Sequence, residues 1–175
     1  MGMSKVVKQT NDVFISEADQ YVFGQGTHYE IYKKLGAHMC THDGKDGVFF
    51  AVWAPNAQDV YVIGEFNGWN ETANKMERIG EGGIYTTFIE NVSEGQMYKY
   101  LIELADGRKL YKADPYANYA ELRPGTASRV YDLNHFEWND SKWMTAREKK
   151  DMNKEPLAIY ECHIGSWMKH PDGTE

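Results

Sequence analysis

Aromatic residues gather at one turn of the sequence, Glu65-Phe66-Asn67-Gly68-Trp69-Asn70. The Asn-Gly pair is a turn signal that follows a strand-like run, so Phe66 and Trp69 are expected beside a tight turn. The whole chain holds five Trp and 12 Tyr, an aromatic share of 14%. Flat rings pack against the apolar C–H face of a sugar, whose hydroxyls need polar neighbours. The composition therefore suits a neutral sugar polymer, although any single ring is as readily explained by the core of a β-sandwich.

A second set of candidate ligands is the alternating motif His38-x-Cys40-x-His42, followed by Asp43. An extended chain would put the three side chains on one face, where zinc could bind. No second Cys/His pair completes a set of four ligands, so we expect no metal and no cofactor. The two cysteines, Cys40 and Cys162, do not make a disulfide framework and are expected to be free thiols.

The charge balance limits the partners of this chain. Its 19 Lys and Arg stand against 26 Asp and Glu, a net charge of -7. Nucleic acid and anionic membrane surfaces both attract a basic footprint, so neither is an expected partner. The first residues lack the apolar core of a signal peptide, and no apolar run is long enough to span a membrane. We therefore predict a cytoplasmic protein.

The middle of the chain, residues 37–133, consists of short β-branched and aromatic runs separated by Asp-Gly, Asn-Gly and Gly-Gly pairs. These pairs supply the turn chemistry of antiparallel hairpins. No helix-length periodic stretch interrupts the runs, which excludes a parallel βαβ sheet. The number of runs fits an immunoglobulin-like β-sandwich. The expected strands are Gly47–Ala54, Asp59–Gly64, Met76–Ile79, Ile84–Ile89, Gln96–Leu104, Arg108–Lys112 and Ser128–Leu133.

The flanking segments have other patterns. Residues 1–36 are expected to form an N-terminal arm and a short helical lead-in, in which Thr27 caps a helix that Gly36 closes. Residues 134–156 are polar and are interpreted as a linker or short helix. Residues 157–175 form a C-terminal tail that begins with an apolar run typical of a buried strand.

Several motifs in order along the chain resemble one family. They are Gly26-Thr27-His28-Tyr29, Leu35-Gly36-Ala37-His38, the Trp69 turn, Tyr98-Lys99-Tyr100, Ala113-Asp114-Pro115-Tyr116-Ala117, Arg123-Pro124-Gly125-Thr126-Ala127-Ser128 and Ile159 to Trp167. Together they resemble the N-terminal region of bacterial 1,4-α-glucan (glycogen) branching enzymes, a carbohydrate-binding module of family 48 type. The resemblance implies an early-set immunoglobulin-like antiparallel sandwich, all-β, in front of a catalytic barrel.

The last motif is similar to the first strand of that barrel. A complete (β/α)8 barrel takes about 250 residues, so residues 157–175 are interpreted as an orphan first strand. The resemblance places the catalytic carboxylates after Glu175. No catalytic residue is therefore expected in this chain.

The resemblance also implies roles for individual residues. Trp69 is expected to stack on a glucose ring, and Lys99 is expected to donate hydrogen bonds to sugar hydroxyls. Asn67 and Asn70 are expected to fix hydroxyls with their amides, although both are equally expected as turn formers. The alternatives are an indole that packs over the end of a sheet and an ordinary exposed strand lysine.

One position departs from the related module of AMP-activated kinase β subunits. That module carries a second stacking Trp shortly after the turn that matches Asp106-Gly107, whereas residues 108–112 here contain none. Tyr111 is the expected substitute, with a smaller ring surface. We therefore expect weaker binding, or a displaced site.

The resemblance implies a non-catalytic module that binds and positions α-1,4-glucan or glycogen, with the absent barrel as its other partner. Two alternatives stay open: a structural spacer that buttresses the barrel without binding sugar, and the equivalent module of a debranching or trehalose-forming relative. Without barrel neighbours, the apolar run from Leu157 to Ile164 is expected to be disordered, to fold back on the sandwich or to self-associate with another copy.

Overall fold

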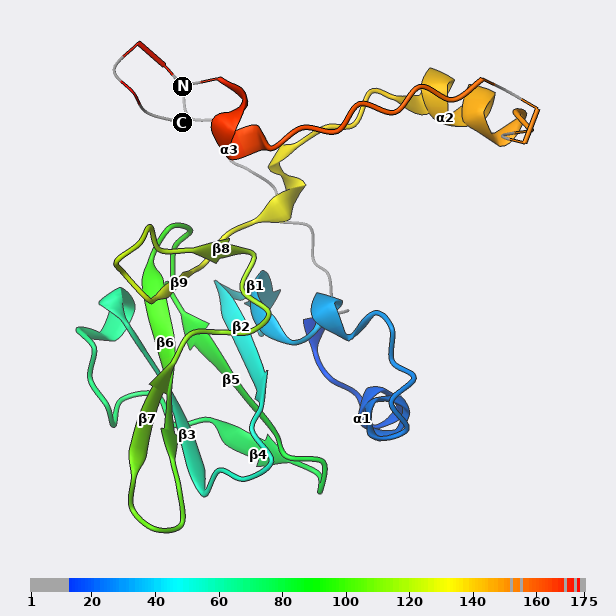
Figure 1. The fold of residues 1–175 in the computed structure, drawn as a ribbon. Helices are drawn as coiled ribbons and strands as arrows, with labels where there is room; N and C mark the ends of the chain where they lie inside the picture. Colours follow the sequence, from blue (N-terminus) through cyan, green and yellow to red (C-terminus); the bar gives the residue numbers. More distant parts are fainter. Residues whose placement is uncertain (1–12, 152, 155, 169, 172, 174–175) are drawn as a thin grey trace. The chain divides into compact units, whose positions relative to one another are not determined.

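The computed structural model describes residues 13–151, 153–154, 156–168, 170–171 and 173. The chain divides into two compact units after His135. The larger unit is an antiparallel β-sandwich, as the turn pattern predicts (Figure 1). Residues 1–12, which form the first part of the predicted N-terminal arm, lie outside the described residues.

Two sheets make up the sandwich. The first sheet has the order β1 (Gly36–His42), β2 (Lys45–Trp53), β5 (Ile84–Glu90) and β4 (Glu77–Ile79). The second has the order β3 (Asp59–Gly64), β6 (Met97–Glu103), β9 (Ser128–Arg129) and β8 (Tyr119–Ala120), and β7 (Lys109–Lys112) also pairs with β6. Every pairing is antiparallel, so the predicted all-β antiparallel sandwich is confirmed.

The core forms where alternate side chains of the two sheets meet. Val48, Phe50 and Val52 of β2 belong to the same buried cluster as side chains of β3 and β6. Full burial of an aliphatic or Phe side chain contributes about 1.5–3 kcal/mol. A shift of one residue in the strand register would move these side chains to the solvent side, so their burial fixes which side of each strand faces inward.

One carboxylate lies in this core. Asp114 is 6% exposed, and its Oδ2 accepts hydrogen bonds from the hydroxyls of Tyr98 (2.6 Å) and Tyr100 (3.3 Å). Its Oδ1 accepts the backbone N–H of Tyr116 at 2.8 Å. Burial raises the pKa of the Asp114 carboxyl, although these hydrogen bonds oppose the shift. The network fixes the inner side of β6, and Lys99 therefore points to the opposite side.

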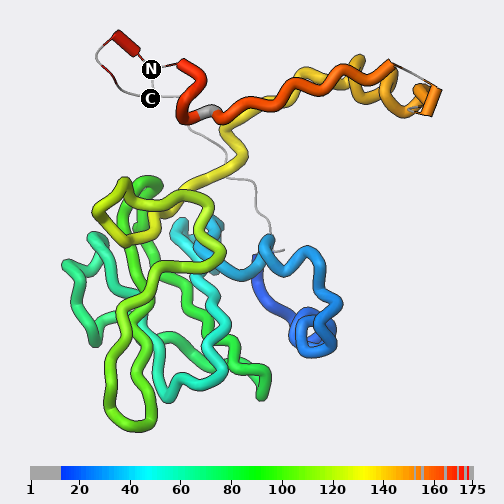
Figure 2. Tube along the Cα trace, in the orientation of Figure 1, coloured from blue at the N-terminus to red at the C-terminus, as the bar shows by residue number. Residues whose placement is uncertain are grey.

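The N-terminal lead-in differs from the prediction. An α-helix, α1, spans Glu17–Gly24 and begins with a capping box between Ser16 and Asp19. The helix predicted after Thr27 is reduced to a single 3-10 turn, η2 (Ile31–Lys33). Thr27 follows the end of α1, where its hydroxyl donates to the carbonyl of Val22 at 3.4 Å instead of capping a new helix. Figure 2 shows this segment beside the sheet that contains β1 and β2.

Strand β1 was not among the predicted strands. Gly36 begins it with a φ of 110° and does not close a helix, so that prediction was wrong. A Cβ at this position would lie 3.0 Å from the carbonyl oxygen of Tyr116. Glycine is therefore required both by the backbone conformation and by the close neighbour.

The strand predicted at Ser128–Leu133 is shorter in the structure. Strand β9 ends at Arg129, and a 3-10 turn, η4, spans Leu133–His135.

The smaller unit contains two helices among its described residues, α2 (Ser141–Glu148) and α3 (Ile164–Trp167). No strand occurs in the described part of this unit, and Leu157, Ile159 and Tyr160 are exposed, so the interpretation of residues 157–175 as the first strand of a barrel stays a prediction. An extended segment without a neighbouring strand has no ladder partner for its backbone groups.

In the part of the chain that the structure describes, no helix is both long and apolar enough to cross a bilayer.

Candidate functional site

The outer side of the second sheet brings several of the predicted site residues together. Tyr98 and Tyr100 face the core, so Lys99 and Leu101 of β6 face outward. The strand register places Leu101 between Tyr61 of β3 and Tyr111 of β7. We call this side the open face. Its exposed or partly exposed residues are Tyr61, Met97, Lys99, Tyr111, Tyr119 and Arg129, whereas Ile63 (3% exposed) and Leu101 (0% exposed) lie on the same side but are buried.

Trp69 lies in the loop that leaves β3 at one border of the open face. The predicted hairpin turn is a 3-10 turn instead, η3 (Glu65–Asn67), which Gly68 ends with a φ of 62°. Trp69 itself has a φ of 61°, and its backbone N–H donates to the carbonyl of Gly64 at 2.8 Å. The side chain is 38% exposed and lies outside both buried clusters. The loop thus presents an indole to solvent from a fixed backbone.

The asparagines of this loop hold its shape. The Oδ1 of Asn67 accepts the N–H of Gly64 at 3.0 Å, and its Nδ2 donates to the carbonyl of Val62 and to Asn74 Oδ1. Asn70 Oδ1 accepts the backbone N–H and the hydroxyl of Thr72. Both residues therefore act as turn formers, and their contact with sugar stays a prediction.

Lys99 projects from β6 toward the loop before β9. Its Nζ donates to Thr126 Oγ1 at 2.7 Å, which orients the ammonium group on the open face. Sequence reasoning did not single out Thr126 as a site residue. The two side chains are 27 residues apart, and no local pattern predicts their contact.

Tyr111 of β7 is tied to the Trp69 loop. Its hydroxyl donates to Glu71 Oε1, and the Nζ of Lys109 lies 2.9 Å from Glu71 Oε2. The hydrogen bond from Tyr111 and then that from Lys109 hold the pKa of Glu71 below its usual range. The ring remains 49% exposed. Glu71 therefore links the loop to the strand beside Lys99.

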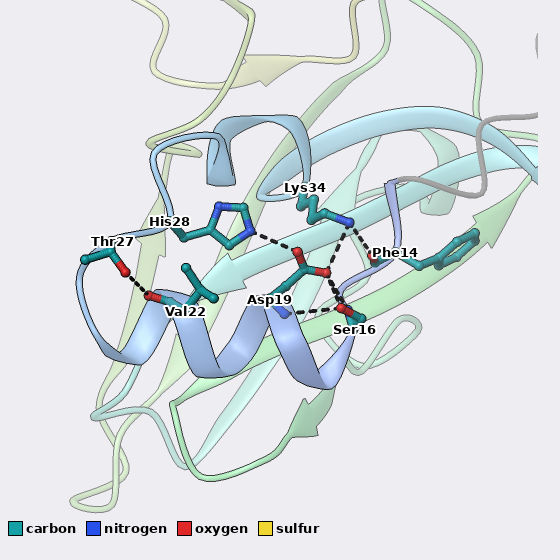
Figure 3. A network of polar contacts seen from close by, with 7 residues as sticks. All are labelled: Phe14, Ser16, Asp19, Val22, Thr27, His28 and Lys34. Atoms are coloured by element: carbon teal, nitrogen blue, oxygen red, sulfur yellow. Dashed lines mark hydrogen bonds and ion pairs between the residues drawn. The ribbon is translucent and has the colours of Figure 1, made fainter.

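A second polar cluster anchors α1 and is suited to structure, not to catalysis (Figure 3). Asp19 Oδ2 accepts the hydroxyl of Ser16 at 2.6 Å, and Asp19 Oδ1 contacts His28 Nε2 at 2.9 Å. The Nζ of Lys34 lies 3.1 Å from Asp19 Oδ2. These contacts gather the helix cap, the imidazole and the ammonium group around one carboxylate, and so hold the start of α1 in place.

The predicted metal candidates have other neighbours. His38 Nε2 lies 2.9 Å from the carbonyl of Leu35, Cys40 is buried, and the His42 ring packs against Phe14 and Phe88. Within the described residues, no group of three His, Cys, Asp or Glu side chains is placed to hold a metal ion. Cys40 and Cys162 are both free.

The machinery for glycoside transfer is absent from these residues. Retaining enzymes hold two carboxylates about 5 Å apart across the scissile bond. The described strands are all antiparallel, and no (β/α)8 barrel occurs among them. The 175 residues therefore lack the catalytic barrel.

The fold and its exposed aromatic residues define a carbohydrate-binding module. Residues 34–117 match the family described as carbohydrate-binding module 48 (isoamylase N-terminal domain), and the chain belongs to this family over that region. The curated relatives narrow the class to the module-bearing region of 1,4-α-glucan branching enzymes. One of these, from Butyrivibrio fibrisolvens, is 68% identical over 93% of this chain and 26% of its own length.

Two further branching enzymes show similar coverage. The enzyme from Halothermothrix orenii is 49% identical over 93% of this chain and 26% of its own length. The enzyme from Protochlamydia amoebophila is 44% identical over 91% of this chain and 22% of its own length. The chain thus spans about a quarter of the length of these relatives. Among solved structures, a putative α-amylase from Salmonella typhimurium aligns at 25% identity and a TM-score of 0.47, over 62% of this chain and 16% of that one.

Proposed function

We propose that the open face binds α-1,4-glucan, and that the chain is the glucan-binding region of a 1,4-α-glucan branching enzyme, which forms α-1,6 branches by transferring glucan segments. The observation that carries the proposal is the half-exposed Trp69 in the loop that leaves β3, a loop that Glu71 ties to Tyr111 on the face that also carries Lys99. The names of the relatives support the parent activity, and the family description supports sugar binding.

The chemistry of each side chain suits a different part of glucose. The Trp69 ring offers apolar area for the C–H face of a sugar. Lys99 has three N–H donors, and its hydrogen bond to Thr126 engages one of them, which leaves two for sugar hydroxyls. The hydroxyl of Tyr111 is engaged by Glu71, and Tyr111 therefore contributes its ring surface.

A structural spacer is the second candidate. It is favoured by the internal hydrogen bonds of Asn67 and Asn70 and by the lack of a Trp after the Asp106-Gly107 turn. The spacer would bury its aromatic residues against its own core. Trp69 and Tyr111 are both exposed outside the buried clusters, and this exposure favours binding.

The test is a titration of the full chain with maltoheptaose, followed by Trp fluorescence and calorimetry. We expect saturable binding, and we expect Trp69→Ala to weaken it by about tenfold or more, because loss of a stacked ring removes about 1.5–3 kcal/mol of apolar contact. Trp53→Ala is the matched control, since Trp53 is 52% exposed on the first sheet.

Binding that is equal in wild type and Trp69→Ala would exclude Trp69 from the site. No binding by either protein would favour the structural spacer. Thermal unfolding of both variants separates a loss of contact from a loss of fold.

A further inference from the structure

We infer that the glucan path continues across the open face to a second contact point made by Tyr119 and Arg129, so that only glucans of several units reach both ends. This inference rests on the proposed function of the open face. Sequence reasoning assigned no role to either residue, and both lie outside residues 34–117, the part matched by the module family.

The strand register places the second contact point on the same side of the sheet as Lys99. Met97 of β6 lies opposite Arg129 of β9, and Arg129 lies opposite Tyr119 of β8. Met97 and Lys99 are two residues apart on one strand and so share a face. The row Met97, Arg129 and Tyr119 therefore extends the open face by two strands.

The span between the two points is set by sheet geometry. Lys99 and Tyr119 are offset by two residues along the strands and by two strands across the sheet. With a rise of about 3.4 Å per residue and about 4.8 Å between strands, their Cα positions are roughly 12 Å apart. A single glucose ring is too short to contact both, whereas a chain of several rings is long enough.

The second contact point is preorganised. The Arg129 guanidinium lies over the Tyr119 ring, 6.0 Å from its centroid, and its Nη1 donates to the carbonyl of Gly95 at 3.2 Å. Tyr131 packs against Tyr119 with ring centroids 5.3 Å apart. Tyr119 nevertheless stays 53% exposed. A ring held by two neighbours loses little entropy when a ligand stacks on it.

The local charges favour a neutral ligand. Glu94, whose side chain accepts the N–H of Asp132 at 3.2 Å, also contacts His135 at 2.6 Å. Arg129 donates to the carbonyl of Gly95, the residue that follows Glu94 in the sequence, and this single guanidinium differs from the clustered cations that bind phosphate. An exposed ring beside a planar set of N–H donors matches the C–H face and the hydroxyls of a sugar.

The test measures the affinity of the full chain for a short and a long ligand. Maltose is titrated by NMR, and maltoheptaose is titrated by calorimetry. We expect Tyr119→Ala to weaken maltoheptaose binding by about threefold to tenfold, since one ring contact is lost, and to leave maltose affinity at the Trp69 end unchanged. Tyr119→Phe should keep the wild-type affinity for both ligands. Tyr29→Ala is the control, because Tyr29 is an exposed tyrosine of the N-terminal segment.

Each outcome decides one of the two proposals. If Tyr119→Ala binds maltoheptaose like the wild type while Trp69→Ala does not, the second contact point is refuted and the open face stands. If the wild type binds neither sugar, the proposed function itself fails. An equal loss for maltose and maltoheptaose in Tyr119→Ala would place Tyr119 in the primary site and refute the extended path.

Discussion

The two outer sides of the sandwich differ in what covers them. The outer side of the first sheet, which we call the closed face, carries Cys40, Phe49, Ala51 and Ile84. Side chains of the N-terminal segment, Val13, Ile31 and Leu35 among them, bury these residues. The open face keeps Tyr111 and Tyr119 exposed and borders the half-exposed Trp69. Most of the closed face is thus covered by the chain itself, apart from Trp53 at the end of β2, whereas the open face keeps several aromatic rings exposed around the buried Leu101.

The difference separates stability from binding. On the closed face, the Asp19 contacts with Ser16, His28 and Lys34 hold α1 in place. On the open face, Lys99 and Tyr111 contribute little to the core, because they lie on the solvent side of the sheet. Substitutions on the closed face should therefore lower the stability and leave the affinity for glucan unchanged. Substitutions on the open face should lower the affinity for glucan and change the stability little.

The largest expected effect on stability is that of Asp19→Ala. Asp19 has a side chain that is 15% exposed, and its removal leaves Lys34 and His28 without this carboxylate and α1 without its capping box. We expect the free energy of unfolding to fall by about 2 kcal/mol and Tm by roughly 4–10 °C. Maltoheptaose affinity should not change. Thermal and urea unfolding measure the first effect and calorimetry the second.

The stability difference between the wild type and Asp19→Ala should depend on pH. Burial alone would raise the pKa of the Asp19 carboxyl, but hydrogen bonds from Ser16, His28 and Lys34 outweigh it and hold that pKa well below its usual range. The stabilisation is therefore complete above the unfolded pKa, about 3.9, and is lost as the pH falls toward the lower folded value. The difference between wild type and variant should narrow below about pH 4. A constant difference, or one matched by the exposed control Asp43→Asn, would contradict the anchoring role.

The next effect is expected on the open face, at Lys99. Lys99→Met keeps an unbranched side chain and removes the donors, so maltoheptaose affinity should fall by about fivefold to tenfold, the loss of one hydrogen bond from a charged group. The stability should change little. Lys45→Met is the control, since Lys45 forms an exposed ion pair with Glu90 on the first sheet. Equal losses of affinity in the two variants would remove the distinction between the faces.

Sequence reasoning predicted the parts of this comparison that depend on local patterns. Asp-Gly and Gly-Gly pairs placed most strands within one or two residues, and alternation placed Lys99 opposite Tyr98 and Tyr100. Period-two alternation and turn chemistry are local, so they can be read from neighbouring residues.

Contacts between distant residues could not be predicted in this way. The link from Glu71 to Tyr111 spans 40 residues and depends on how the Trp69 loop folds back. The capping box at Ser16 was missed because Asp19 takes the place of the usual Glu or Gln.

The smallest effect is expected for Glu71→Gln. The amide keeps the shape of the side chain but weakens its contacts with Lys109 and Tyr111, so the Trp69 loop should be held less firmly and affinity should fall by about twofold. The hydrogen bonds from Tyr111 and Lys109 lower the pKa of Glu71, so its protonation begins at a lower pH than that of an ordinary glutamate, whose pKa is about 4.3. Any loss of wild-type affinity on acidification in a calorimetric titration should therefore be centred below that ordinary value. A decline centred on the ordinary glutamate pKa would contradict this link.

NMR mapping of maltoheptaose on the full chain shows where the sugar binds. If it binds on the open face, amide shifts will concentrate on the Trp69 loop, β6, β7 and β9, and residues of β1, β2 and α1 will stay unchanged. Shifts concentrated on β1, β2 and α1, or a saturating ligand that shifts no amide of the second sheet, would contradict binding on the open face.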